Sequence, residues 1–227
     1  MSGRRLTGLS SMATRHILNN LARDYELQTR ARVEIRSMGG VEAAKLARAN
    51  EATDIVVLAS KVMVSLEAEG HLAKGATRDF ARSEIGVAVC AGSALPSLAD
   101  EQAVKQAVLD AQKICYSTGP SGDHLKALCE QWGVPPERVL IAPSGVPVAT
   151  LVANGDADLG FQQLSELIGQ PGIEVVGPLP PEIQAVTVFS AGISTMSQDP
   201  EGAGAFVAYL ASAKTGDAKR RHGMEPA

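Results

Sequence analysis

The chain has 227 residues, of which 45% are hydrophobic, 20% are charged and 4% are aromatic, and its formal net charge is −4. This length and composition are typical of a globular protein with a substantial buried core. The weakly acidic balance and the scarcity of aromatic side chains argue against nucleic-acid binding, and no apolar stretch is long enough for membrane insertion.

The first third of the chain alternates between strands and helices. Apolar strands are predicted near residues 4–9, 32–37 and 54–59, and amphipathic helices near 11–29, 41–49 and 61–69. The run Ile55–Ala59 is apolar throughout, as in a strand that is buried on both faces. We therefore expect a parallel sheet with helices on both sides.

A second alternating series follows. Strands are predicted near 85–90, 113–116, 139–142, 157–161, 173–176 and 185–191, and helices near 102–111, 122–132, 146–153, 163–168 and 202–213. The first and last of these strands bracket the series and are suited to carry the chain into a second lobe and back. The predicted lobes are residues 1–84 with 190–227, and the inserted residues 85–189. The predicted fold class is α/β, with a mostly parallel sheet flanked by helices in each lobe and a ligand cleft between the lobes.

Four predicted strands run directly into small hydroxyl and glycine residues that begin the next helix. These junctions are Leu6–Ser11, Val33–Gly40, Ile55–Ser60 and Ile114–Gly122. Each one places unpaired backbone N–H groups, hydroxyls and the positive end of a helix dipole at the carboxyl end of a strand. Such a position favours an anion, so the four junctions predict several helix N-termini around one anionic ligand.

The three cysteines, Cys90, Cys115 and Cys129, all lie in apolar segments. Their number is odd, and the sequence contains neither a CxxC pair nor a Cys/His cluster with metal-binding spacing. We interpret all three as small buried thiols, and we predict no metal site.

The junctions resemble those of the type II periplasmic-binding-protein-like family, especially its molybdate-binding branch. The resemblance covers nearly the whole chain and rests on Ser10-Ser11, Ser37–Gly40, Asp54–Ser60, Tyr116–Gly122 and Gly155–Gln163. It implies that hydroxyls and backbone amides at the strand–helix junctions hold an oxyanion. By position, Ser10 or Ser11, Ser37, Ser121 and the segment Ser144–Val148 match ligand-contacting places.

One position departs from the molybdate binders. Where they have a tyrosine after the last strand of the second lobe, this chain has Phe161-Gln162-Gln163, and a glutamine suits a carboxylate or a hydroxyl at least as well. The stretches Ser10–His16 and Gly160–Gln163 look closer to aconitate isomerase, an enzyme of the same superfamily. The resemblance therefore implies either a receptor for small anions or an isomerase.

The expected ligand-binding residues are small or amide-bearing positions at these junctions. They are Ser10, Ser11, Ser37, Gly39, Gly40, Ser60, Ser117, Gly119, Ser121, Gly122, Val146 and Gln162. A single serine at such a place is better explained as a helix cap. The whole set, with glycines that allow a ligand to approach the backbone, favours an anion pocket.

The expected catalytic residues are Arg15 and His124. Arg15 lies one helical turn from the expected pocket, where a guanidinium can pair with a carboxylate; the alternative is a solvated surface residue. His124 lies in the first turn of a helix, where the dipole favours a neutral imidazole that can act as a base. Its alternative is a flanking surface histidine.

Two functions rank ahead of a third, a cytoplasmic ligand-sensing domain. The first is a cofactor-independent isomerase that binds a small organic polycarboxylate and moves an allylic proton. The second is the solute-binding component of an ABC transporter for molybdate-type oxyanions or carboxylates, with an ABC permease as its partner. The first strand begins close to Met1 without a secretory signal, which predicts a cytoplasmic location, or a periplasmic one if a signal peptide has been removed.

Overall fold

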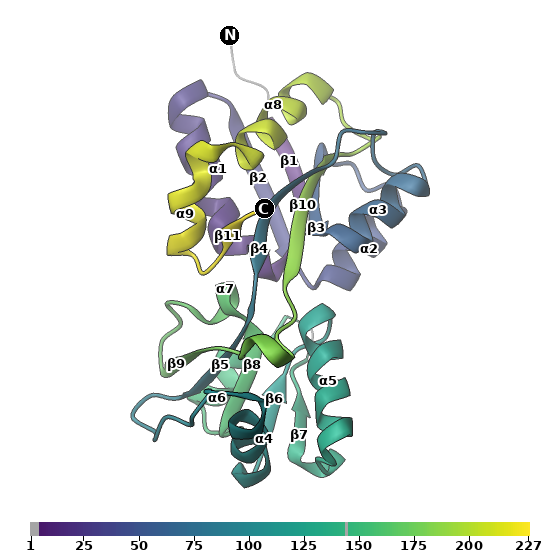
Figure 1. Ribbon diagram of the computed structural model, residues 1–227. Helices are drawn as coiled ribbons and strands as arrows, with labels where there is room; N and C mark the ends of the chain where they lie inside the picture. Colours follow the sequence, from purple (N-terminus) through teal and green to yellow (C-terminus); the bar gives the residue numbers. More distant parts are fainter. Residues whose placement is uncertain (1–4, 144) are drawn as a thin grey trace. The chain divides into compact units, whose positions relative to one another are not determined.

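A computed structural model describes residues 5–143 and 145–227. Contacts divide the chain into two compact units, one formed by the residues up to Arg82 with Val188–Ala227, and the other by Ser83–Thr187. The lobe boundaries expected from the sequence lie two residues from these points and stay a prediction. Each unit is a sheet with flanking helices, as predicted (Figure 1).

The first unit contains a six-stranded sheet in the order β11-β4-β10-β3-β1-β2. Its strands are β1 (Arg5–Ser11), β2 (Arg32–Met38), β3 (Ile55–Ala59), β4 (Arg78–Ser83), β10 (Thr187–Ile193) and β11 (Glu225–Pro226). Its helices are η1 (Met12–Thr14), α1 (Arg15–Thr29), α2 (Gly40–Arg48), α3 (Ser60–Ala68), α8 (Pro200–Ala211), η4 (Ala213–Thr215) and α9 (Gly216–Arg221). Strand β1 pairs in parallel with β2 and β3, whereas β10 runs antiparallel to β3.

Helices cover both faces of this sheet (Figure 1). Successive residues of a strand point to opposite faces. In β3, Ile55 and Val57 therefore join the apolar cluster that contains side chains of α1 and α8, while Val56 and Leu58 join the cluster of α2 and α3. This explains why the sequence of β3 is apolar at every position.

The second unit contains a five-stranded sheet in the order β7-β6-β8-β5-β9. Its strands are β5 (Ile85–Cys90), β6 (Ile114–Tyr116), β7 (Val139–Ile141), β8 (Leu159–Gln163) and β9 (Ile173–Pro178). Its helices are α4 (Glu101–Asp110), α5 (Pro120–Trp132), η2 (Pro136–Arg138), α6 (Val148–Ala153), α7 (Leu164–Leu167) and η3 (Pro181–Ile183). Residues of α4 and α5 share one apolar cluster with β5, and residues of α6 pack in others.

The predicted α/β architecture is confirmed, but the sheets are mixed and not mostly parallel. Strand β10 runs against β3, and β5 runs against both β8 and β9. These strands adjoin the points where the chain passes from one unit to the other. They therefore enter their sheets without the crossover helix that a parallel neighbour requires.

Strand β4 and helix α9 are absent from the sequence prediction. Strand β4 reads Arg-Asp-Phe-Ala-Arg-Ser and buries only Phe80, Ala81 and Ser83, so its charged positions mask the strand pattern. Helix α9 is short, ends in Lys-Arg-Arg and buries a lysine, which no hydrophobic periodicity indicates.

The Asp54 side chain, just before β3, forms hydrogen bonds with β1 and with the segment before α8. Its carboxylate accepts hydrogen bonds from the N–H and hydroxyl of Thr7 at 2.9 and 3.2 Å, from the Ser197 hydroxyl at 2.8 Å and from the Gln198 N–H at 3.0 Å. Burial raises the pKa of this carboxyl, but the hydrogen bonds together outweigh burial and lower the pKa below its usual value.

We expect Asp54→Asn to lower the free energy of unfolding by about 2 kcal/mol at pH 7, because hydrogen bonds to an ionised group are lost. Since the folded-state pKa is depressed, this stabilisation is present above about pH 4 and is lost as the pH falls through the folded value. Urea unfolding at pH 7 and pH 3 measures both effects. Asp110→Asn, exposed on α4, is the control, and an Asp54→Asn curve equal to that control contradicts the prediction.

Lys219 of α9 is only 1% exposed, and its Nζ lies 5.8 Å from the centroid of the Phe80 ring. The aromatic face favours the charged ammonium. Burial opposes the charge and lowers the pKa of Lys219 to about 8. The folded protein thus carries an ammonium group that is poorly solvated at neutral pH.

We expect Lys219→Met to raise the Tm at pH 7, because a methionine fills the space without the cost of a desolvated charge. The unfolded lysine keeps its proton to about pH 10.4, so the wild type regains stability between pH 8 and pH 10. The gain of the variant should therefore shrink over that range. Lys214→Met, at an exposed position of the same segment, should show no such pH-dependent gain in calorimetry.

Candidate functional site

The carboxyl ends of β2, β1 and β3 lie at one edge of the first sheet, because these strands are parallel. The register places Ser10 opposite Ser37, and their hydroxyl oxygens are 2.8 Å apart. Ser10 is fully buried and Ser37 is half-buried. Two of the predicted ligand-binding residues are thus brought together by strand pairing alone.

Ser11 has an unsatisfied hydroxyl at this same edge. It is 8% exposed, and its Oγ has no hydrogen-bond partner in the described part of the chain. Gly40 is the first residue of α2. The Cβ atom of Ser11 lies 3.8 Å from the position that a Cβ atom on Gly40 would occupy. Gly39 precedes that helix as its N-cap and supplies no side-chain cap. A buried hydroxyl without a partner costs about 1–3 kcal/mol, which a bound acceptor at this helix start would relieve.

Arg15 is the first residue of α1 and is half-buried. Its Nη2 lies 3.2 Å from Nε2 of His16. Burial lowers the pKa of His16, and the charge of Arg15 lowers it further. The neutral His16 ring therefore accepts a hydrogen bond from the guanidinium, which places the positive charge at the start of α1.

Ser60 begins α3 and belongs to a three-residue cluster with Ser190 of β10 and Asp79 of β4. Oδ1 of Asp79 accepts a hydrogen bond from Ser60 at 2.8 Å and from Ser190 at 2.5 Å, and the two hydroxyls are also in contact. Ser190 is buried, Ser60 half-buried and Asp79 exposed. The start of α3 thus already holds a carboxylate, supplied by the chain itself.

In the second unit, α5 begins at the predicted glycine and serine residues. Gly119 is its N-cap with φ of +102°, a conformation that favours glycine, and Ser121 is buried at the second helical position. A Cβ at Gly122 would collide with the carbonyl oxygen of the half-buried Ser117. Gly122 is therefore required by the turn that precedes the helix.

His124 lies in the first turns of α5 and is half-buried. Its Nε2 donates a hydrogen bond of 2.7 Å to the carbonyl oxygen of Ile183 in η3. This bond sets the tautomer of a neutral ring, so Nδ1 is the nitrogen that can accept a proton.

The start of α6 is capped by Gln162. The Gln162 Oε1 accepts a hydrogen bond from the N–H of Val148 at 3.2 Å, and its Nε2 donates to Glu166 at 2.7 Å. The N–H of Val146 donates to the carbonyl of Pro143 at 3.0 Å. Both predicted residues are therefore engaged within the unit. Ser144, in the same predicted segment, lies outside the described residues.

Three polar residues are missing from the predicted site residues: Asp79 and Ser190 in the first unit, and Gln163 in the second. Gln163 is 3% exposed; its Nε2 donates to the Thr187 hydroxyl at 2.8 Å, and its Oε1 has no partner in the described chain. Gln163 belongs to the Gly160–Gln163 stretch, and Ser190 is the one polar residue within the apolar run Val188–Ala191. For Asp79 no sequence signal is visible, because its role comes from contacts with two distant segments.

The cysteines are free thiols. Cys115 and Cys129 are buried as predicted, and burial raises their pKa values to about 12 and about 11. Cys90 is half-buried, which corrects the expectation that all three are buried.

Within residues 5–143 and 145–227, no group of three or more His, Cys, Asp or Glu side chains is arranged to hold a metal ion. No helix in these same ranges has the length and apolar character needed to cross a membrane.

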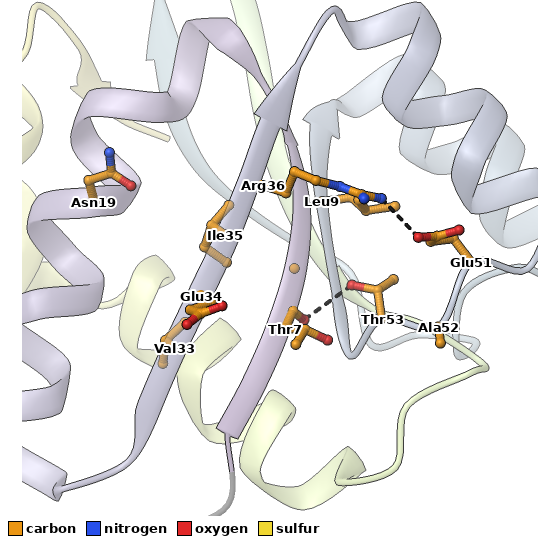
Figure 2. A pocket seen from close by; sticks show the side chains of 11 residues that line it. Thr7, Leu9, Asn19, Val33, Glu34, Ile35, Arg36, Glu51, Ala52 and Thr53 are labelled. Carbon is orange, nitrogen blue, oxygen red and sulfur yellow. Dashed lines mark hydrogen bonds and ion pairs between the residues drawn. The ribbon is translucent and has the colours of Figure 1, made fainter.

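A surface hollow of about 620 Å³ lies on the first unit and is lined by residues of β1, β2 and the segment before β3 (Figure 2). Arg36 and Glu51 form an ion pair at its side, and the Thr53 hydroxyl donates to the carbonyl of Thr7. Its lining residues include none of the predicted site residues. The predicted anion-binding residues therefore do not line this hollow.

The comparisons with known proteins identify the family. A model of the bacterial extracellular solute-binding proteins matches residues 6–225, and the chain belongs to this family. It is 35% identical over 233 residues to an aconitate isomerase from a Pseudomonas species, covering 97% of this chain and 87% of that protein. The resemblance found in the sequence is thereby confirmed.

Solved structures share the fold. The periplasmic molybdate-binding protein of Azotobacter vinelandii matches with a TM-score of 0.78 and 22% identity, over 96% of this chain and 98% of that one. The tungstate-binding protein of Desulfovibrio alaskensis matches with a TM-score of 0.68 and 16% identity, over 99% of both chains. At these identities the likeness shows the fold alone.

We expect Ser11→Ala to leave the Tm of the ligand-free protein unchanged or slightly higher, because it removes a hydroxyl that has no partner. The same change should weaken binding of a small anion about tenfold, the effect of one lost hydrogen bond to a charged group. Thermal unfolding and calorimetric titration with citrate and sulfate measure the two effects. Ser65→Ala, exposed on α3, is the control. Unchanged affinity together with a lower Tm in Ser11→Ala would show a purely structural hydroxyl.

Proposed function

We propose that this protein is a cofactor-independent isomerase that interconverts cis- and trans-aconitate by a 1,3-shift of an allylic proton. The observation that carries the proposal is the 35% identity to aconitate isomerase over 97% of the chain. The unpaired Ser11 hydroxyl and the open start of α2 support it, because they suit a carboxylate.

The reaction needs carboxylate binding and one mobile proton. A base takes a proton from the methylene carbon beside a carboxylate, and the C–H electron pair forms a new C=C bond. The pair of the old C=C bond then takes up the proton at the other end of the allylic system, so no atom is gained or lost. Hydrogen-bond donors and helix N-termini stabilise the negative charge that develops on the substrate.

Several of the expected residues suit this chemistry. Ser10, Ser11 and Ser37 with the start of α2 are the proposed carboxylate-binding groups in the first unit, and Ser121 with the start of α5 is the proposed group in the second. Arg15 is the proposed cationic partner of a substrate carboxylate. Of the His124 ring, only Nδ1 is suited to exchange a proton, because Nε2 is bonded to Ile183.

The second candidate function is the solute-binding component of an ABC importer, with an ABC permease as partner. The family to which the chain belongs is described as extracellular and solute-binding, and structural matches include molybdate- and tungstate-binding proteins. The family description favours the periplasmic location over the cytoplasmic one for either function.

We expect cis- and trans-aconitate to raise the Tm of the purified protein, because a ligand that binds only the folded state stabilises it. We also expect proton NMR to show each isomer growing from the other at a rate proportional to protein concentration. Molybdate, tungstate, sulfate and citrate complete the panel, and heat-denatured protein is the control.

Stabilisation by aconitate with an unchanged spectrum would contradict the isomerase and support a carboxylate receptor. Stabilisation by molybdate or tungstate alone would support an oxyanion receptor.

A further inference from the structure

We propose that Asp79 is the base that moves the allylic proton, an assignment that rests on the isomerase function proposed above. Asp79 is exposed on β4, and its Oδ1 accepts hydrogen bonds from Ser60 and Ser190. A carboxylate that is held in place and also accessible can approach a carbon-bound proton, which is the geometric requirement for a general base.

Ser60 and Ser190 both donate their hydroxyl hydrogens to Asp79. Each serine has one hydroxyl hydrogen, and both hydroxyls point to the same carboxylate oxygen. Ser60 was expected to donate to the ligand, but in this arrangement it orients a carboxylate of the protein. The positive end of α3 faces the same group, since Ser60 is the first residue of that helix.

The sheet order places this carboxylate at the same edge of the first sheet as the proposed substrate-binding groups. Ser10, the penultimate residue of β1, pairs with Val57 of the neighbouring parallel strand β3, and Ser60 follows Val57 three residues later. Neighbouring strands are about 4.8 Å apart and a strand rises about 3.3 Å per residue, so Ser60 lies one strand to the side of Ser10 and three residues beyond its level. Asp79 lies one hydrogen bond further than Ser60. A ligand bound at Ser10, Ser11 and the start of α2 therefore has Asp79 on its β10 side, within the same unit.

The charge of Asp79 is not neutralised by its neighbours. No ion pair to Asp79 occurs among residues 5–143 and 145–227. The adjacent Arg78 directs its guanidinium to the carbonyls of Gly75 and Thr77. A negative group at this edge repels an anion that is only to be bound, so its presence there is unfavourable for a simple oxyanion receptor. A carboxylate that must accept a proton from the substrate explains it.

Removing the carboxylate charge should separate catalysis from binding. In Asp79→Asn, we expect kcat to fall at least 100-fold, as for loss of a general base, while KM stays equal or decreases because the repulsion is gone. The amide oxygen can still accept from both serines, so the Tm should change little. Asp79→Glu keeps a carboxylate and should restore part of kcat.

Deuterium exchange distinguishes a catalytic role of Asp79 from a merely structural one. In D₂O the wild type should incorporate deuterium at the allylic carbons of recovered substrate and product, and Asp79→Asn should not, although it binds trans-aconitate. Asp217→Asn removes an exposed carboxylate of the same unit and should behave as the wild type. His124→Gln removes the other candidate base, and loss of exchange in this variant alone would place the proton transfer at His124.

The outcomes separate this assignment from the proposed function. Wild-type isomerisation and exchange that persist in Asp79→Asn, or that vanish in His124→Gln instead, would overturn the assignment of Asp79 alone. A wild-type protein that neither isomerises aconitate nor exchanges its protons would overturn the isomerase and the assignment together.

Discussion

The parallel pairing of β2, β1 and β3 is the constraint on which the candidate site depends. Parallel strands bring their carboxyl ends to one edge, and the helices that follow them begin at that edge. The pairing register then decides which side chains meet, as for the Ser10 and Ser37 hydroxyls. A shift by one residue would send these side chains to the opposite face of the sheet and separate the pair from the helix starts.

Helix starts that look alike in the sequence differ in what they hold. The start of α2 lies beside the Ser11 hydroxyl, which is buried without a partner. The start of α3 faces Asp79, and the start of α6 is capped by Gln162. At α3 a carboxylate of the protein takes up the hydroxyl hydrogens of Ser60 and Ser190, and at α6 an amide oxygen takes up one backbone N–H, whereas the Ser11 hydroxyl beside α2 has no partner in the described chain.

A binding protein and an isomerase share most of this architecture. Both need oriented hydroxyls and amides for an anion, and these groups also stabilise a carbanion that is conjugated with a carboxylate. The added requirement of an isomerase is a base beside the substrate. Asp79 provides one without any change in fold, because β4 and β10 pair next to β3 and need only present a carboxylate and a serine there.

The sequence by itself determined the α/β class, the order of most strands and helices, and the serine and glycine junctions, because hydrophobic periodicity and helix-start chemistry are local properties. Tertiary structure alone decided which hydroxyl and N–H groups at the strand–helix junctions already have a partner within the protein. The Ser60–Asp79–Ser190 cluster joins residues up to 130 positions apart, and the Gln162 cap joins β8 to α6. It also decided that Lys219 is buried. Such contacts arise from strand order and packing, which no local pattern encodes.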